Sequence, residues 1–445
     1  MNVRDFVKLM KNKGEVLTIS KNISPRYEMA AVLHKLDGGP VVLFENVDGY
    51  SDAVVGGIFS SRRRFCEILQ VNEEDLHSTL LKALRSPSKP KEEGALDYKL
   101  EEDLGALPIL THYEGDPGPY ITAGIVIAKS PSEDLHNASF HRLLVLDHRH
   151  LAIRIVPRHL HKMFSEAKRR GEDLPIAICV GAPPPVSIAA SMSPPYGVDE
   201  LQVANTLMKG ALKIAAVEPY GIVVPVDTEI VIIGKILHDR EAEEGPFVDL
   251  TGTYDIRRKQ PVVKVERVLK REEKALYQAI LPGGREHRLL MGIPREATML
   301  EALTKLYPQV KKVRLTDGGS NWLHAVVSIT KVSEGDGKNI GLAALAVNPS
   351  LKHVVVVDDD IDPEDPQQVE WAIATRFQGD RDLLTMPGLR GSSLDPSADQ
   401  QSLSTCKIVV DATKPLEGEV KIYEKVKPPA LPAALEELLR EKGCI

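Results

Sequence analysis

The chain has 445 residues, 43% of them hydrophobic and 27% charged, which is ordinary for a globular protein with room for two or three domains. Its net charge of −7 argues against nucleic acid or an anionic membrane surface as the main partner. No apolar run approaches the ~18 residues that span a bilayer, and the first residues carry no apolar signal-peptide core, so we expect a cytoplasmic protein.

The first part of the chain alternates helical and strand patterns, which predicts an N-terminal α/β domain over residues 1–105. Residues Asp5–Lys11 and Glu73–Leu84 show helical periodicity, and Pro40–Phe44 is typical of a short buried strand. The segment Arg85–Gly94 holds two prolines and dense charge without any periodicity. It therefore predicts a linker between domains.

Residues 106–285 carry several β-branched runs separated by proline and glycine, and this spacing favours a β-rich central domain. The predicted strands include Tyr120–Ala128, Ile153–Val156, Ile222–Val226, Glu229–Ile233 and Val262–Val268.

Residues 286–445 return to alternating helices and strands, as in domains built on a parallel sheet. The predicted elements are a helix at Thr298–Tyr307, strands at Val326–Thr330 and Val354–Val357, and a helix at Asp365–Thr375 capped by Asp365. At the end, Ala433–Lys442 has leucines at helical spacing and predicts an amphipathic helix. This helix could pack on its own domain or dock on a neighbouring subunit.

The most informative motif is Glu244-Gly-Pro-Phe-Val-Asp249, which sets two carboxylates five residues apart. In an unbroken strand these two side chains would point to opposite faces. Gly245 and Pro246 favour a bend that can bring both acids to one site. The alternative is a polar strand end whose acids are solvated.

Four further motifs accompany this one along the chain. They are Asn137–Arg142 (NASFHR), Val156–His159 (VPRH), Ala189–Glu200 (AASMSPPYGVDE) and Leu281–His287 (LPGGREH). In this order, the five motifs resemble those of the UbiD family of decarboxylases, which use prenylated FMN. The resemblance extends from about Leu107 to Thr413. It implies an N-terminal α/β domain, a central flavin-binding split β-barrel and a C-terminal α/β domain that forms a homodimer or higher homo-oligomer.

The same resemblance implies a cofactor site. Asn137, His159 and Glu200 would hold a divalent metal against the flavin phosphate, and their oxygen and imidazole donors suit Mn²⁺ or Mg²⁺ better than structural zinc. The remaining residues that the family pattern assigns to the cofactor are Ser139, Arg142 and Arg158, with the main-chain oxygens of Ala189, Ala190 and Met192 binding K⁺ in a proline-flanked loop. A flavin prenyltransferase would supply the cofactor.

Arg142, Glu244 and Asp249 match the catalytic arginine and two acids of the family. By this match, Arg142 forms a bidentate pair with Glu244 and helps to position the substrate. Asp249 is left free to deliver a proton to carbon after CO₂ leaves. The resemblance thus implies a carboxy-lyase that acts on an unsaturated carboxylic acid of small size.

Two other clusters invite a metal interpretation. Six of the thirteen histidines lie between His136 and His161, which raises the alternative of a zinc hydrolase, although no HExxH spacing is present. The acidic run Asp358–Asp362 follows a predicted strand, where acids act as turn formers and helix caps, so we interpret it as structural.

The sequence is consistent with more than one substrate. The motifs are most similar to the archaeal branch, where a member converts trans-anhydromevalonate phosphate to isopentenyl phosphate. His141 and Arg158 are candidates to hold a substrate phosphate. The enzymatic alternative is an aromatic, hydroxybenzoate-type acid decarboxylase. Alternatives of another class are a split-barrel flavin oxidoreductase and a non-catalytic carboxylase subunit.

Overall fold

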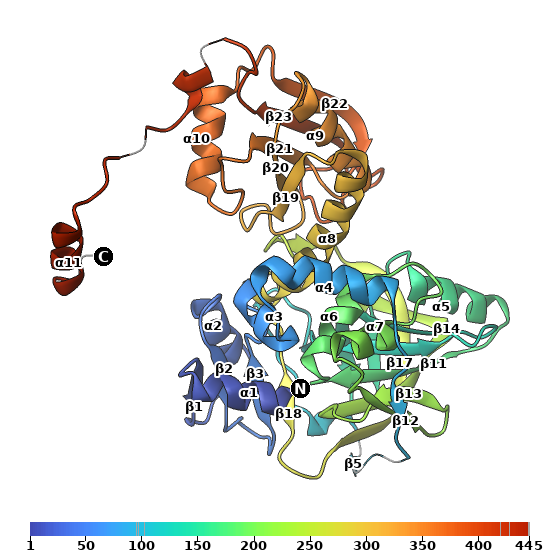
Figure 1. Ribbon diagram of the computed structural model, residues 1–445. Coiled ribbons are helices and arrows are strands. Elements are labelled where there is room, and N and C mark those ends of the chain that lie inside the picture. The colour runs from blue at the N-terminus through green and yellow to red at the C-terminus, as the bar shows by residue number, and fades with distance from the viewer. Residues whose placement is uncertain (95, 97, 102, 419, 427, 444–445) are drawn as a thin grey trace.

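The computed structural model describes residues 1–94, 96, 98–101, 103–418, 420–426 and 428–443. In Figure 1 the N-terminal and central segments lie together in the lower part, and residues after about 307 form the upper part. Helix α8 (Arg285–Leu306) lies where the two parts meet. In the described part of the chain, every helix is too short or too polar to cross a bilayer.

The N-terminal segment builds a four-stranded sheet in the order β1-β2-β3-β18, whose last strand, β18 (Leu276–Gln278), comes from much later in the chain. Its other elements are α1 (Val3–Asn12), β1 (Val16–Ile19), α2 (Glu28–Lys35), β2 (Val41–Phe44), β3 (Ala53–Gly56), α3 (Arg62–Leu69) and α4 (Glu73–Arg85). The two predicted helices and the predicted buried strand are confirmed as α1, α4 and β2.

The central segment forms a nine-stranded antiparallel sheet on the path β6-β9-β10-β17-β14-β11-β7-β8, with β5 paired to β17. Its strands are β5 (Tyr98–Glu101), β6 (Tyr120–Ile121), β7 (Ile125–Lys129), β8 (His136–Phe140), β9 (Leu143–Asp147), β10 (His150–Ile153), β11 (Leu174–Val180), β14 (Ile230–Glu244) and β17 (Arg258–Arg271). Around it lie α5 (His159–Arg169), α6 (Pro184–Met192), α7 (Glu200–Leu207), β4 (Lys91–Glu92), β12 (Lys213–Val217), β13 (Ile222–Pro225), β15 (Phe247–Val248) and β16 (Tyr254–Asp255).

The β-rich character of this segment is therefore confirmed, but the described strands do not close into a barrel. The mixed α/β fold class holds, while the split barrel and the exact domain boundaries stay predictions. The single strand predicted over Tyr120–Ala128 is wrong, because the chain breaks into β6 and β7 around Gly124. A Cβ on Gly124 would lie 3.0 Å from Leu143, so this close approach requires glycine.

The predicted linker Arg85–Gly94 is held against the central segment. The Asn205 amide donates to Ser88 Oγ at 2.9 Å and to the Lys89 carbonyl at 2.9 Å, and β4 pairs with β12. Two hydrophobic cores also join this region, one combining Phe6 and Leu80 with Ile127, and the other combining Phe44 with Ile178. The N-terminal and central segments consequently pack as one unit.

The C-terminal segment has a five-stranded sheet in the order β19-β20-β21-β23-β22, in which β20, β21 and β23 run parallel as the sequence predicts. Its elements after α8 are β19 (Val310–Leu315), β20 (His324–Ile329), α9 (Asp336–Val347), β21 (His353–Asp358), α10 (Pro366–Arg376), β22 (Leu383–Arg390), β23 (Ser404–Ala412) and α11 (Ala433–Glu441).

Two predictions in this segment have clear outcomes. The acidic run is structural, because the fully buried Arg376 pairs with Asp358 at 2.8 Å and with Asp360 at 2.7 Å. The tail helix forms, but it has no buried residue and Leu435 is 48% exposed. It stands apart from both main parts in Figure 1. Packing on its own domain is therefore wrong, and docking on a neighbouring subunit stays a prediction.

Candidate active site

A cavity of about 630 Å³ lies between the central sheet, helix α8 and residues 390–403 of the C-terminal segment. Among its lining residues are eight that the sequence singles out, namely Asn137, Ser139, Arg142, Arg158, His159, Ala190, Glu200 and Asp249. These residues come from four separate motifs, so the fold collects them around one space. A cavity of this size falls in the range of small-molecule and cofactor sites.

Arg142 forms the centre of a charged cluster beside this cavity. Its Nε and Nη2 donate to the two oxygens of Glu244 at 2.8 and 2.9 Å, the bidentate pair that the sequence predicts. Its Nη1 also donates to Asp249 Oδ2 at 2.8 Å, and the role of Asp249 as proton donor stays a prediction. The guanidinium therefore aligns both carboxylates of the Glu244–Asp249 motif.

The bend that makes this possible occurs where it is predicted. Strand β14 ends at Glu244, and Gly245 has φ +92°, a conformation that favours glycine. A Cβ at Gly245 would also lie 3.2 Å from the Ile256 carbonyl oxygen. The turn leaves Glu244 fully buried behind Arg142, whereas the Asp249 side chain is 19% exposed and borders the cavity. The two acids thus occupy different environments.

A third carboxylate, Asp255, completes the cluster and was not predicted. Strand β16 pairs with β15 and places Asp255 opposite Phe247, where its Oδ2 accepts from Arg142 at 2.9 Å and its Oδ1 from Arg258 at 2.5 Å. Burial opposes ionisation of Asp255, but the hydrogen bond from Arg258 and the charge of Arg142 outweigh it and hold its pKa below the usual value. No sequence motif marks Asp255, and its place in the cluster follows only from the pairing of β15 with β16.

Burial also disfavours the Arg142 cation, yet its pKa is raised by the hydrogen bonds that it donates to Glu244 and by the three carboxylate charges. Tyr120 supports the same group, since its hydroxyl donates to Glu244 Oε1 at 3.1 Å and accepts from the Gly245 amide at 3.1 Å. Burial raises the pKa of Tyr120, which stays neutral and keeps donating. Sequence motifs gave no signal for this tyrosine.

The predicted metal ligands converge on Glu200, the first residue of α7. Its Oε1 accepts from Asn137 Nδ2 at 2.9 Å and lies 3.7 Å from His159 Nδ1. Its Oε2 accepts from the Ala138 amide at 2.9 Å. Glu200 is 2% exposed, and no lysine or arginine lies within ion-pair distance of it among the described residues. A buried carboxylate without a cationic partner, beside an imidazole and an amide, fits a hard divalent cation.

Ser139 and His141 extend this network. Ser139 Oγ lies 3.0 Å from both Asn137 Oδ1 and His141 Nε2, and His141 Nδ1 lies 2.8 Å from the Arg154 carbonyl oxygen. Burial lowers the pKa of His141 to about 4, so the ring is neutral at pH 7. Its single proton then sits on Nδ1, bound to Arg154, and Nε2 is an acceptor. His141 is consequently unsuited to hold a substrate phosphate.

The segment with Ala189, Ala190 and Met192 differs from prediction, because it is the last turn of helix α6 rather than a loop. Three consecutive residues, Pro183 to Pro185, start the helix, and proline is tolerated in the first turn. Carbonyl groups in the last turn of a helix lack partners within the helix, so main-chain oxygens are still available there. Ala190 lines the cavity, and the K⁺ role of this segment stays a prediction.

Arg158 precedes α5, and its Nη1 donates to Ser193 Oγ at 2.7 Å, just past the end of α6. It is thus tied to the same corner as His159. Four further cavity-lining residues had no role predicted from the sequence: Arg154, His287, Arg295 and Trp322. Of these, His287 lies in the Leu281–His287 motif but was given no role. Its position in a family motif is the one sequence signal that could have indicated a site role for His287.

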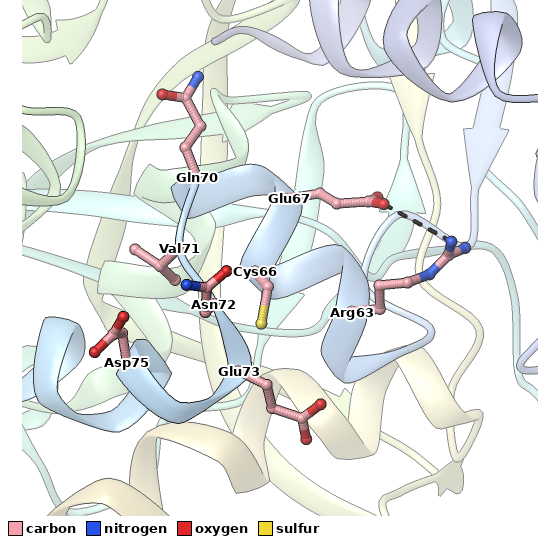
Figure 2. Close-up of a pocket in the computed structure, with 8 residues that line it drawn as sticks. All are labelled: Arg63, Cys66, Glu67, Gln70, Val71, Asn72, Glu73 and Asp75. Atoms are coloured by element: carbon pink, nitrogen blue, oxygen red, sulfur yellow. Dashed lines mark ion pairs between the residues drawn. The ribbon is translucent and has the colours of Figure 1, made fainter.

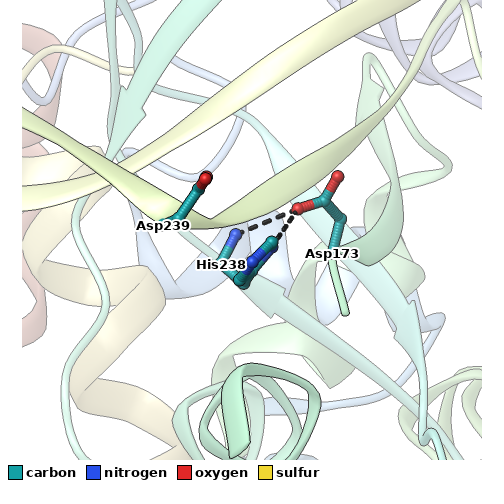
Figure 3. Close-up of side chains that lie close together, drawn as sticks. All are labelled: Asp173, His238 and Asp239. Atoms are coloured by element: carbon teal, nitrogen blue, oxygen red, sulfur yellow. Dashed lines mark hydrogen bonds and ion pairs between the residues drawn. The ribbon is translucent and has the colours of Figure 1, made fainter. Parts of the chain in front are cut away.

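Two other places on the molecule are weaker candidates for a binding site. A hollow of about 660 Å³ at the α3–α4 corner is lined by Cys66, Asn72 and neighbouring charged side chains, among which Arg63 already pairs with Glu67 (Figure 2). The group Asp173, His238 and Asp239 has its possible ligand atoms within 4.8 Å of one another (Figure 3). There, however, Asp173 is already bound by His238 and by Lys235.

The six histidines behind the zinc hypothesis do not converge. His148 pairs with Asp103, His150 with Asp147, and His161 faces Ser165 at 3.5 Å. In the described part of the chain, the sole group of histidine, cysteine and acidic side chains with metal-like spacing lies elsewhere, at His238. The zinc hydrolase alternative therefore lacks a ligand cluster.

Three family models match consecutive parts of the chain. They are the N-terminal, Rift-related and C-terminal domains of 3-octaprenyl-4-hydroxybenzoate carboxy-lyase, over residues 7–84, 84–285 and 288–412. The chain is 45% identical to anhydromevalonate phosphate decarboxylase of Methanothermobacter thermautotrophicus, over 94% of this chain and 98% of that protein. It is 43% identical to the protein of the same name from Methanocaldococcus jannaschii, with the same coverage.

Solved structures give the same picture. The UbiD-class enzyme HmfF from Pelotomaculum thermopropionicum, in complex with FMN, superimposes with a TM-score of 0.94 at 39% identity, over 96% of this chain and 98% of that one. Apo 3,4-dihydroxybenzoic acid decarboxylase (AroY) from Klebsiella pneumoniae superimposes with a TM-score of 0.91 at 26% identity, over 99% of both chains. The similarity therefore spans the whole chain in sequence and in fold.

Proposed function

The chain belongs to the UbiD family of carboxy-lyases, and on that premise we propose that it decarboxylates trans-anhydromevalonate phosphate to isopentenyl phosphate. The observation that carries the proposal is the alignment of Glu244 and Asp249 by Arg142 at the wall of a cavity. The choice of substrate rests on relatives. Those named for this substrate are 41–45% identical, whereas a gallate decarboxylase is 29% identical.

We propose that the cavity holds prenylated FMN, with the nine-stranded sheet as the split barrel of the family. HmfF, the neighbour with FMN, supports a flavin here. Asn137, His159 and Glu200 would hold Mn²⁺ or Mg²⁺ against the flavin phosphate, Ser139, Arg142 and Arg158 would contact the cofactor, and the end of α6 would bind K⁺. A flavin prenyltransferase would supply the cofactor, and a homodimer or higher homo-oligomer is the expected assembly.

The residues of this chain manage charge and protons. Prenylated FMN, when bound, supplies the electron sink that loss of CO₂ from an sp² carbon requires. Arg142 positions the substrate and keeps both acids oriented through its hydrogen bonds. Asp249, at the cavity wall, delivers the proton to the α-carbon after CO₂ has left. Glu244 is out of reach of the substrate because it is fully buried, and it fixes the Arg142 guanidinium.

The test is turnover by protein produced with and without a flavin prenyltransferase. The holo-protein should release CO₂ from trans-anhydromevalonate phosphate and form isopentenyl phosphate, and protein without the cofactor should be inactive. Hydroxybenzoates and cinnamates serve as comparison substrates. Turnover of aromatic acids alone would contradict the substrate but keep the enzyme class. Oxidation of NAD(P)H without CO₂ release would favour the oxidoreductase alternative.

A further inference from the structure

Helix α8 carries a half-buried cation that has no anionic partner among the described residues. Arg295 borders the cavity, and its Nη1 donates to the Met291 carbonyl oxygen at 2.6 Å. Among the residues that the structure describes, no carboxylate lies within ion-pair distance of it. Burial, followed by the charge of Arg158, lowers the pKa of Arg295 to about 9, so the group is still charged at neutral pH. A cation that is partly removed from water in this way is stabilised when an anion pairs with it.

Of the five other arginines that line the cavity, Arg142, Arg158 and Arg258 already have side-chain partners. Arg142 binds three carboxylates, and Arg258 binds Asp255. Arg158 donates to Ser193 beside the predicted metal ligand His159, and the proposed function assigns it to the cofactor phosphate. Arg295 lies on another wall of the cavity, formed by α8, although it is close enough to Arg158 for the Arg158 charge to lower its pKa.

The wall around Arg295 is built to hold the guanidinium in one orientation. Its carbon Cζ lies 3.9 Å from the centre of the Trp322 ring, a close cation–π contact. The Trp322 indole is fixed in turn, because its Nε1 donates to Ser392 Oγ at 3.0 Å. With one face stacked and one nitrogen bound to Met291, the remaining donors are free for a planar, bidentate contact with an oxyanion.

Position along α8 relates this cation to the reacting centre. His287, Met291 and Arg295 are spaced by four residues, share one face of the helix and all line the cavity. His287 is close enough to Asp249 and Arg142 for their charges to act on its pKa. Eight residues of helix correspond to a rise of ~12 Å from His287 to Arg295. One face of α8 therefore has His287, near the proposed proton donor Asp249, at one end and Arg295 at the other.

We propose that Arg295 binds the terminal phosphate of the substrate and is the residue that makes the enzyme select a phosphorylated acid. This inference rests on the proposed function. Trp322 acts as a positioning residue, since it stacks on Arg295 and holds the guanidinium in place. The substrate then lies along α8, with its carboxylate end beside Asp249 and its phosphate beside Trp322.

The experiment compares wild-type holo-protein with Arg295→Gln and Arg295→Lys. Binding of isopentenyl phosphate is measured by calorimetry, and kcat/KM is measured for trans-anhydromevalonate phosphate and for the same acid without phosphate. In Arg295→Gln the dissociation constant should rise about 10- to 100-fold, as expected for loss of a charge-assisted contact, and the preference for the phosphorylated acid should fall equally. Arg295→Lys keeps the charge and should lose less.

Lys305→Gln is the matched control, because it removes a positive charge from the exposed end of the same helix. It should bind and react as wild type does. Cofactor content is measured in every variant, from the absorbance and mass of the released flavin. Unchanged binding in folded Arg295→Gln and Arg295→Lys would overturn the inference. Loss of flavin in Arg295→Gln would also overturn it, since Arg295 would then hold the cofactor phosphate. If wild-type holo-protein neither binds nor converts the phosphorylated compounds, the proposed function itself fails.

Discussion

The two acids of the Glu244–Asp249 motif should respond differently to neutralisation. Asp249→Asn leaves shape and volume intact but removes the group that carries the proton to carbon. General acid–base catalysis contributes typically ~10²–10⁴-fold, so turnover should fall by about that factor, or roughly 3–5 kcal/mol of activation free energy. The cofactor should stay bound, because Asp249 lies outside the predicted metal ligands.

The stability of Asp249→Asn and Glu244→Gln should follow the opposite order, with Glu244→Gln the more destabilised of the two. Three carboxylates and two guanidinium groups, those of Arg142 and Arg258, make a cluster with a net charge of −1. Asp249→Asn brings it to zero, so the free energy of unfolding should change little. Glu244 is fully buried and accepts two hydrogen bonds from Arg142 and one from Tyr120. An amide there has one acceptor oxygen, so Glu244→Gln leaves buried donors unpaired and should destabilise the protein by about 1–3 kcal/mol.

The assay that separates these roles is deuterium uptake at the terminal vinylic carbon of isopentenyl phosphate, the former α-carbon of the substrate acid, during incubation with holo-protein in D₂O. Asp249→Asn should suppress the exchange, and Asp249→Glu is the matched variant that retains a proton carrier and should keep part of it. Glu244→Gln should lower turnover by disturbing Arg142, with exchange falling in proportion to turnover. Near-normal turnover and exchange in Asp249→Asn would refute the reasoning and show that another group carries the proton.

Two further predictions concern the cofactor site and the start of α8. Glu200→Ala removes the carboxylate on which Asn137 and His159 converge, so the purified protein should lose both its divalent metal and its flavin, as measured by elemental analysis and absorbance. Retention of both would contradict the predicted ligand set. Burial raises the pKa of Glu286 to about 7, compared with 4.5 for an exposed glutamate, which corresponds to about 3 kcal/mol. The folded state holds this proton more tightly than the unfolded chain does, so the free energy of unfolding should fall as the pH rises from about 4.5 to 7. Urea titrations of wild type and Glu286→Gln should show this slope in the wild type alone, and equal slopes would contradict the assignment.

Local patterns in the sequence predicted the elements and the bend of the motif. The helices α1, α4 and α10 and the strand β21 follow from apolar periodicity and from caps such as Asp365, because these depend on neighbours a few residues apart. The turn at Gly245 follows from the restrictions that glycine and proline place on the backbone. The family resemblance then assigned roles to residues that no spacing would have grouped.

Tertiary structure alone decided which side chains share the cavity. Asp255 joins Arg142 through the pairing of β15 with β16, Tyr120 reaches Glu244 from a strand more than a hundred residues earlier, and Arg295 faces the cavity because α8 lies against it. The loop predicted at Ala189–Met192 became a helix, since packing of its wholly buried residues outweighs the local turn signals. Contacts between distant segments depend on register and packing, and a single sequence encodes these only through the complete fold.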